Sequence, residues 1–237
     1  MNGAQSGEGG GPIGRTSGKG GGPVPPPGGK GGGPVPPPSG KGGGGNAFGA
    51  APVVIGPIIL CCPPSESCIG ETVLSGTTRF TVECQKQFYW CWAAVAVSVE
   101  RYFSSQSHRT QCQLAGLVLN RRCCPDLVVC NVPERLEDAL GITRTLSQAL
   151  GGVILSFDEI RQEIDAGRPV CVRIGWQPNE AYGHFVVIRG YSVSSVGEQW
   201  VDITDPYYFD STVPYHQFVY AYLDAGEWTD TYLVKHP

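Results

Sequence analysis

The sequence lacks an apolar run long enough to cross a membrane. Its longest, residues 47–62, is interrupted by Pro52, Gly56 and Pro57 and is too short to span a bilayer. The first ten residues, MNGAQSGEGG, also lack the apolar core of a secretory signal. We therefore expect no membrane anchor, and a protein that is either cytoplasmic or exported by a route that needs no classical leader.

Clustered basic charge is missing as well. The 237 residues include 17 Lys and Arg against 21 Asp and Glu, which gives a formal net charge of −4 at pH 7. The basic residues of the first 45 positions are widely spaced, and the remainder of the chain is net acidic. Because phosphate contacts require clustered Lys and Arg, nucleic acid is not an expected partner.

Glycine and proline are concentrated at the start of the chain. Residues 1–45 hold 20 of the 34 glycines and nine of the 20 prolines, and the unit GKGGGPVPPP occurs at 18–27 and again at 29–38. Such a segment alternates flexible glycine hinges with stiff polyproline spacers and cannot form a core. We predict a disordered tail over 1–60, serving as a linker or removable pro-segment, followed by one folded domain over 61–237. A docking peptide for a proline-binding partner is the alternative.

Hydrophobic periodicity and capping signals predict helices in the first half of this domain. They are Cys91–Phe103; Thr110–Asn120, with Thr110 and Gln113 as a capping box; a helix that begins at Asn131, with Pro133 and Glu134 in its first turn; and 157–167, capped by Ser156 and Glu159 and ended by Gly167.

The second half is rich in Val, Ile and aromatic residues at strand spacing. The predicted strands are 169–176, 183–193, 199–204 and 228–235. Helices followed by strands indicate an α+β domain in which the helices pack against an antiparallel sheet.

Cys91 is the first residue of the predicted helix 91–103. Unpaired N–H groups and the positive end of the helix dipole stabilise a thiolate there, and a thiolate is the nucleophilic form of cysteine. Because free cysteines are among the most buried residue types, an ordinary core role for Cys91 is the alternative.

Two side chains in the strand-rich half could assist a thiol. His184, one of four histidines, lies at the head of a predicted strand and could act as base and then acid. Asp205 follows the strand 199–204, and Pro206 after it places the carboxylate at the rim of the sheet, where it could orient an imidazole. Asp202 is the rival carboxylate, and a buried structural histidine is the alternative role for His184.

An oxyanion donor is expected in the loop before Cys91. Gln85 lies six residues upstream, where its amide could join the Cys91 backbone N–H in binding a negatively charged oxygen. Gln87 is the alternative donor.

The segments QKQFYWCWAA, GHFVVIRGY and VDITDP occur in this order. Together they resemble the papain-like cysteine peptidases of bacteria, most closely the branch with the effector protease that plant pathogens inject into host cells. Bacteriocin-leader peptidases and staphopains are more distantly similar. The resemblance covers residues 83–235, whereas the low-complexity start matches no folded pro-domain of these peptidases.

The resemblance implies a papain-like fold with a helical left lobe, a sheet-rich right lobe and substrate in the cleft between them. It implies a cysteine endopeptidase that acts on protein or peptide substrates, needs neither metal nor cofactor, and is a monomer. Cys91, His184 and Asp205 would form the catalytic triad and Gln85 the oxyanion donor. The residues expected to border the substrate are Trp90, Trp92, Trp176, Tyr182 and Gly183, with ordinary core positions as the alternative for the tryptophans.

Other functions use the same residues. An acyltransferase or deamidase would need the same nucleophile, base and oxyanion donor. A binding module recruited through the tail would not need the full set, so peptide hydrolysis is the preferred interpretation, with self-processing of the tail as an extension.

The cysteines outside position 91 include two similar motifs, CCPPSESC at 61–68 and CCPDLVVC at 123–130. Disulfides, reduced structural thiols and a zinc site are the three interpretations, of which zinc fits the spacing least well. Cys171 alternates with valines on a predicted strand and is expected to be a buried free thiol.

Overall fold

The computed structural model describes residues 72–178, 183–208 and 210–237. Their helices are α1 (Cys91–Phe103), α2 (Gln111–Val118), α3 (Leu136–Ile142), α4 (Phe157–Asp165) and α5 (Tyr215–Ala221), with a short 3-10 turn, η1, at Val128–Cys130. The strands are β1 (Thr72–Thr77), β2 (Leu146–Gly151), β3 (Val170–Trp176), β4 (Gly183–Ser194), β5 (Gln199–Thr204), β6 (Ser211–Pro214) and β7 (Gly226–Val234). The predicted boundary at residue 60/61, the tail and its repeat lie outside the described residues.

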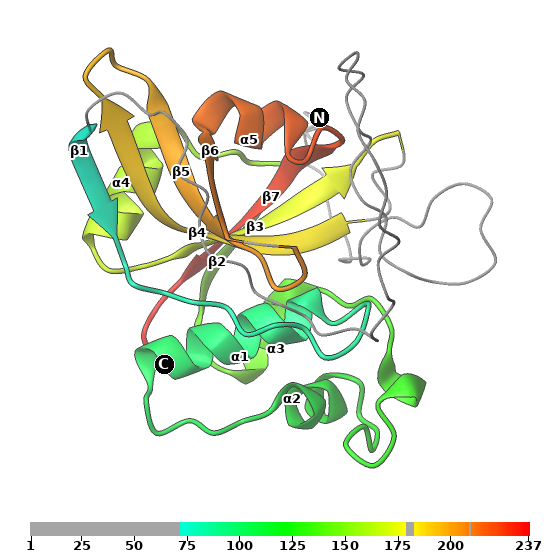
Figure 1. The fold of residues 1–237 in the computed structure, drawn as a ribbon. Coiled ribbons are helices and arrows are strands. Elements are labelled where there is room, and N and C mark those ends of the chain that lie inside the picture. Colours follow the sequence, from blue (N-terminus) through cyan, green and yellow to red (C-terminus); the bar gives the residue numbers. More distant parts are fainter. Residues whose placement is uncertain (1–71, 179–182, 209) are drawn as a thin grey trace, which may run out of the picture.

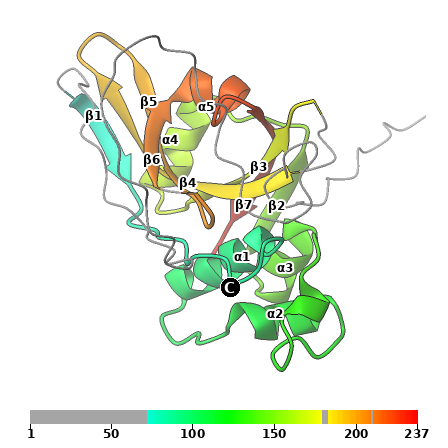
Figure 2. The same ribbon diagram turned by 45° about the vertical axis from the view of Figure 1, so that its right-hand side comes forward.

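The strands form one antiparallel sheet in the order β2-β7-β3-β4-β5-β6, and β1 pairs with the far half of β4. Helices α1, α2 and α3 pack together on one side, which is the lower part of Figure 1. Helices α4 and α5 lie on the other side, where the curved sheet partly surrounds them (Figure 2). The predicted α+β architecture, with a helical lobe and a sheet lobe, is confirmed.

Two apolar clusters fill the sides of the sheet. One joins α1, α2 and α3 to sheet residues such as Cys171, Phe185 and Tyr232. The other joins α4 and α5 to the alternate residues of the same strands, including Val172 and Val186. Strands buried on both faces lose the polar alternation of an exposed sheet, which explains the nearly continuous apolar sequences of β3 and β4.

Most predicted elements are present with small shifts at their ends. Helix α1 has the predicted bounds, and the capping boxes at Thr110 and Ser156 both form. The third predicted helix was placed wrongly: α3 begins at Leu136 rather than near Asn131. Asn131 does not cap a helix, because its Oδ1 accepts a hydrogen bond from the Tyr89 N–H at 2.9 Å.

Five elements were not predicted, namely β1, β2, β6, α5 and the turn η1. Their sequences are short or mixed, and β2, for example, is fixed by its pairing with β7. Within the described residues, no helix combines the length and apolar character needed to cross a bilayer.

Candidate active site

His184 and Asp205 form a buried pair at one end of the sheet. Nε2 of His184 lies 2.8 Å from Oδ1 of Asp205, and both side chains are fully buried. The register of β4 and β5 explains the contact: Val187 pairs with Thr204, so the next residue, Asp205, emerges on the same face as His184.

Cys91 meets this pair from the helical side. As the first residue of α1 it lies where backbone N–H groups have no partner within the helix. Nε2 of His184 faces Asp205, and its buried Nδ1 has no hydrogen bond of regular geometry within the described residues. The Cys91 side chain is fully buried, and its thiol contributes to raising the pKa of the imidazole.

Burial and charge act in opposite directions on the protonation of this pair. Burial alone would lower the pKa of His184, but the Asp205 charge and hydrogen bond, together with the Cys91 thiol, raise it to about 10. Burial alone would raise the pKa of Asp205, but His184 and the N–H groups of Tyr208 and Tyr207 lower it. The pair therefore favours an imidazolium beside a carboxylate at neutral pH.

Aromatic rings surround the imidazole. Trp176 stacks on His184, with ring centroids 6.4 Å apart and planes inclined by 21°. Tyr208 presents an edge at 5.9 Å, and its N–H donates to Oδ1 of Asp205. Trp176 was expected to border the substrate; it is 5% exposed and covers the imidazole. These rings exclude water and so strengthen the interaction between His184 and Asp205.

Trp90 and Trp92 flank Cys91 in sequence, yet both are fully buried. Nε1 of Trp90 donates to the Cys130 carbonyl at 2.7 Å, and Nε1 of Trp92 donates to the Val132 carbonyl at 3.1 Å. Contrary to the expectation that they border a cleft, the indoles are core side chains. They fix the beginning of α1, and hence Cys91, on the segment 130–132.

Gly183 and Tyr182 precede His184. Tyr182 lies outside the described residues. Gly183 is buried, and a Cβ atom there would overlap the guanidinium of Arg173. Arg173 forms an ion pair with Asp230 of β7 at 3.6 Å. Gly183 therefore packs against the guanidinium of this ion pair, and this contact supports the beginning of β4.

Gln85 is 5% exposed and is tied to the sheet through its backbone, because its N–H donates to the Pro206 carbonyl at 2.9 Å. Its side-chain Nε2 donates to the carbonyls of Gln87, at 2.9 Å, and Phe88, at 2.6 Å. The predicted donor lies in the loop before Cys91, but both amide hydrogens are directed to this loop. Gln87 itself is half-buried, and its carbonyl takes part in the same turn.

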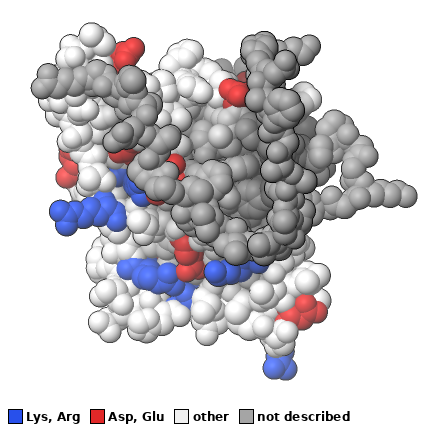
Figure 3. Space-filling view, in the orientation of Figure 1, with Lys and Arg blue, Asp and Glu red and all other residues white. Residues whose placement is uncertain are grey.

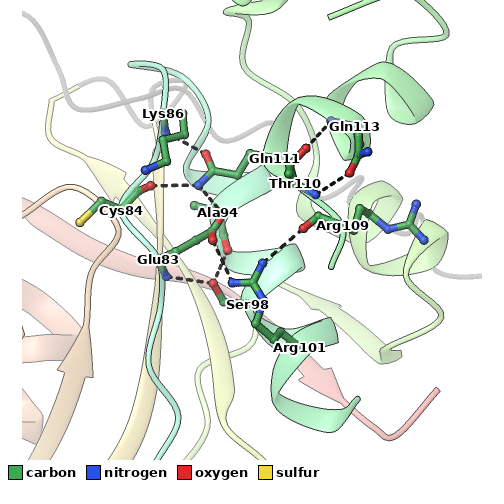
Figure 4. A network of polar contacts seen from close by, with 10 residues as sticks. All are labelled: Glu83, Cys84, Lys86, Ala94, Ser98, Arg101, Arg109, Thr110, Gln111 and Gln113. Carbon is green, nitrogen blue, oxygen red and sulfur yellow. Dashed lines mark hydrogen bonds and ion pairs between the residues drawn. The ribbon is translucent and has the colours of Figure 1, made fainter. Parts of the chain in front are cut away.

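Gln111, the first residue of α2, holds the backbone on both sides of Gln85 (Figure 4). Its Nε2 donates to Oε1 of Glu83 at 2.7 Å and to the Cys84 carbonyl at 2.9 Å. Its Oε1 accepts from the Lys86 N–H at 2.8 Å. No local sequence pattern marks Gln111, since only the neighbouring capping box of Thr110 and Gln113 is recognisable.

Glu83 links the same loop to α1. Its N–H donates to Oγ of Ser98 at 2.9 Å, and its carboxylate pairs with Arg101 at 2.9 Å (Figure 4). Helices α1 and α2 therefore fix the loop 83–86 together.

Two disulfides cross-link the helical side. Cys112 pairs with Cys124, and Cys123 pairs with Cys130. The zinc interpretation of the motif at 123–130 is therefore wrong, and the described residues contain no cluster suited to a metal ion. The motif at 61–68 lies outside the described residues. Cys171 is a buried free thiol, as predicted, and burial raises its pKa far above the ordinary range.

Charges of both signs occur together on the face seen in Figure 3. Several cations are held by ion pairs, such as Arg109 with Glu100 at 2.9 Å and Arg189 with Asp210 at 2.7 Å. These pairs neutralise basic charge locally. That no nucleic acid is bound stays a prediction.

The model of the Peptidase_C39-like family matches residues 78–230, which is well over half of the chain. No curated protein matches the chain. A similar solved structure is that of digestive procathepsin L 3 from the larval midgut of Tenebrio molitor, with 12% identity, a TM-score of 0.43 and coverage of 71% of this chain and 74% of that one.

Proposed function

Because the chain belongs to the Peptidase_C39-like family and is a cysteine peptidase, we propose that Cys91, His184 and Asp205 are its nucleophile, its acid–base residue and its orienting carboxylate. The observation that carries this proposal is the buried imidazole of His184, which interacts with the Cys91 thiol and lies 2.8 Å from the Asp205 carboxylate. The three groups come from α1, β4 and the end of β5.

The reaction follows from these contacts. The proton of the Cys91 thiol resides on Nδ1 of His184 when the sulfur forms a bond to the carbonyl carbon of the substrate peptide, and the π electrons of the C=O bond move onto its oxygen. The imidazolium then protonates the departing amine as the C–N bond breaks, which leaves a thioester. Water gives a proton to Nδ1 and attacks the thioester, and the C–S bond breaks to release the acid and restore the thiol.

Asp205 would keep His184 in the correct tautomer. Its carboxylate accepts from Nε2, which directs Nδ1 to the thiol and stabilises the imidazolium once the proton has moved. The raised pKa of His184, about 10, and the lowered pKa of Asp205 both favour an imidazolium beside a carboxylate over the neutral range.

The oxyanion would be bound by the backbone N–H of Cys91 and the side chain of Gln85. Cys91 supplies an N–H at the first turn of α1, where the helix dipole also favours negative charge. The Gln85 amide would have to turn from the Gln87 or Phe88 carbonyl toward the substrate oxygen. Within the described residues, Oε1 of the same amide has no hydrogen-bond partner, so only the two bonds of Nε2 would have to be exchanged.

A peptide-library digest tests the proposal. The wild-type chain should cut internal peptide bonds, whereas Cys91→Ala and His184→Ala should not. Cys171→Ala is the matched control, because it removes a buried free thiol that is not part of the proposed triad. Cutting by Cys91→Ala at the wild-type rate would overturn the proposal.

Self-processing is a further part of the proposal. Gly and Pro dominate residues 1–45, a composition that predicts a tail without a core of its own. Intact mass after incubation at neutral pH should show loss of an N-terminal fragment from wild type but not from Cys91→Ala. An intact wild-type chain would exclude self-processing. Whether the protein cleaves other substrates would then be decided by the peptide-library digest.

The disulfides suggest where the protein works. Pairs such as Cys112–Cys124 persist in oxidising compartments and are rare in the reducing cytosol. We therefore place the mature protein in an oxidising environment. This favours export over the cytoplasmic alternative, and mass mapping of the pairs in protein from its native source tests it.

A further inference from the structure

Tyr222 binds the oxygen of Asp205 that His184 does not use. The Tyr222 hydroxyl donates to Oδ2 of Asp205 at 2.8 Å, and the side chain is fully buried. The other oxygen, Oδ1, lies 2.8 Å from Nε2 of His184. It also accepts hydrogen bonds from the N–H groups of Tyr207, at 2.8 Å, and Tyr208, at 2.9 Å. Within the described residues, Tyr222 is thus the donor that fixes the remaining oxygen.

The backbone around Tyr222 holds this hydroxyl in place. Tyr222 and Gly226 exchange two backbone hydrogen bonds across a tight turn, in which Leu223 and Asp224 adopt φ angles of 49° and 64°. These left-handed conformations are costly for residues other than glycine. A Cβ at Gly226 would overlap Ile174, so only glycine allows the turn to pack against β3. The turn therefore presents Tyr222 from a defined position.

The ring of Tyr222 is also fixed by packing. It meets Phe218 of α5 edge to face, with centroids 5.4 Å apart. A phenylalanine at position 222 would keep this contact and lose only the hydroxyl. The role of the hydroxyl can therefore be separated from the role of the ring.

We propose that Tyr222 is a positioning residue, which holds the Asp205 carboxylate in the orientation that directs Oδ1 to His184. The proposal rests on the proposed function, because it assigns Tyr222 a role only if Asp205 orients His184. Without the hydroxyl, Oδ2 would be a buried carboxylate oxygen with no donor among the described residues, and the orientation of the carboxylate would depend on the contacts of Oδ1 alone.

The charged and titratable groups around Tyr222 favour a neutral donor. They are Asp205, Tyr208 and Asp210, while Arg189 pairs with Asp210 at 2.7 Å. Burial and the Asp205 charge raise the pKa of Tyr222 well above its usual value, so the hydroxyl keeps its proton throughout the working range. Tyr222 therefore stabilises the carboxylate form of Asp205 without exchanging protons with the substrate.

The test compares Tyr222→Phe with Tyr215→Phe. Tyr215 is the matched control, because its hydroxyl donates to a backbone carbonyl, that of Leu155, at 2.7 Å, and it lies on the neighbouring helix α5. The readout is the rate at which iodoacetamide alkylates Cys91 as a function of pH, followed by mass mapping. This rate reports the reactivity of the Cys91 thiol beside His184 and needs no known substrate.

Tyr222→Phe should move the acid limb of this profile to higher pH by about one unit, because the Asp205 carboxylate takes up a proton more readily once it has lost a hydrogen bond. It should also lower kcat for a cleaved peptide about tenfold, with little change in KM, as expected for loss of a hydrogen bond to a charged group. Tyr215→Phe should leave both unchanged. In an Asp205→Asn background, Tyr222→Phe should have no further effect on the acid limb.

The outcomes separate the two proposals. If Tyr222→Phe folds and gives the profile of Tyr215→Phe, the role of Tyr222 is wrong while the triad stands. If Asp205→Asn leaves alkylation and turnover unchanged, the role of Asp205 is wrong and that of Tyr222 fails with it. If Tyr222→Phe shifts the acid limb equally in the Asp205→Asn background, Tyr222 acts through another group and the proposal is overturned.

Discussion

Replacing Gln111 with alanine should loosen the loop that carries Gln85. Gln111 is 2% exposed and makes three hydrogen bonds, to the Glu83 carboxylate, the Cys84 carbonyl and the Lys86 N–H. At about 1 kcal/mol for each neutral bond and somewhat more for the charged one, their loss should cost about 3 kcal/mol of unfolding free energy. For a domain of this size, that corresponds to a fall in Tm of roughly 10 °C.

Gln113→Ala provides the comparison. Gln113 lies on the same helix, and the hydrogen bond that its side chain accepts comes from the Thr110 N–H of the capping box rather than from the loop 83–86. Its replacement should cost less than about 1 kcal/mol. Both variants replace a glutamine of the same helix by alanine. The difference between their thermal unfolding temperatures therefore measures the contribution of the contacts between Gln111 and the loop.

The kcat of the same two variants tests whether the loop contacts matter for catalysis. At a temperature where both variants are folded, Gln111→Ala should lower kcat, but by less than Gln85→Ala, for which loss of an oxyanion donor is worth about 100-fold or more. Gln113→Ala should keep the wild-type kcat. If Gln111→Ala unfolds at the same temperature as Gln113→Ala and keeps full kcat, the contacts of Gln111 do not hold the loop, and the reasoning is refuted.

The remaining predictions concern the imidazole and the cysteines. Asp205→Asn should lower the pKa of His184 from about 10, so the alkaline limb of kcat/KM should move to lower pH; an unmoved limb would show that Asp205 does not support the imidazolium. Because the pKa of His184 rises from 6.5 on folding, its contribution to stability is complete below pH 6.5 and is lost as the pH rises to about 10, which denaturant titrations across this range should show. Replacing Cys112 and Cys124 together by alanine should lower the unfolding free energy by about 3 kcal/mol, as expected for a cross-link over 12 residues; an unchanged denaturation midpoint would contradict this. Cys171 should resist alkylation in the folded protein at neutral pH, since burial raises its pKa, and labelling at the rate of the unfolded chain would contradict the structure.

The sequence predicted those parts of the fold that depend on interactions between residues close together in the chain. Helix α1 repeats apolar residues at helical spacing, and the capping boxes at Thr110 and Ser156 are short-range hydrogen bonds, so these features appear where they were expected. The start of α3 was missed because Asn131 resembles a cap, whereas a long-range bond to Tyr89 occupies its side chain. Strand β2 depends on its partner β7 and has no strong signal of its own.

The proposed site contains both local and tertiary features. Cys91 begins α1, His184 lies near the start of β4 and Asp205 follows β5, as the sequence predicts, while their catalytic roles stay a proposal. Tyr222 follows Asp205 by 17 residues and reaches it through a tertiary contact, so no local pattern indicates its role. Trp90 and Trp92 were expected near the substrate because they flank Cys91, but helical geometry directs both indoles to the segment 130–132.

The central claim, that His184 activates Cys91, is tested most directly by limited alkylation with iodoacetamide at neutral pH. Labelling at Cys91 and Cys171 would be compared by mass mapping in wild type and His184→Ala. Cys91 should be labelled much faster than Cys171 in wild type, and this preference should be lost in His184→Ala. Equal labelling of the two cysteines in wild type, or an unchanged preference in His184→Ala, would contradict the claim.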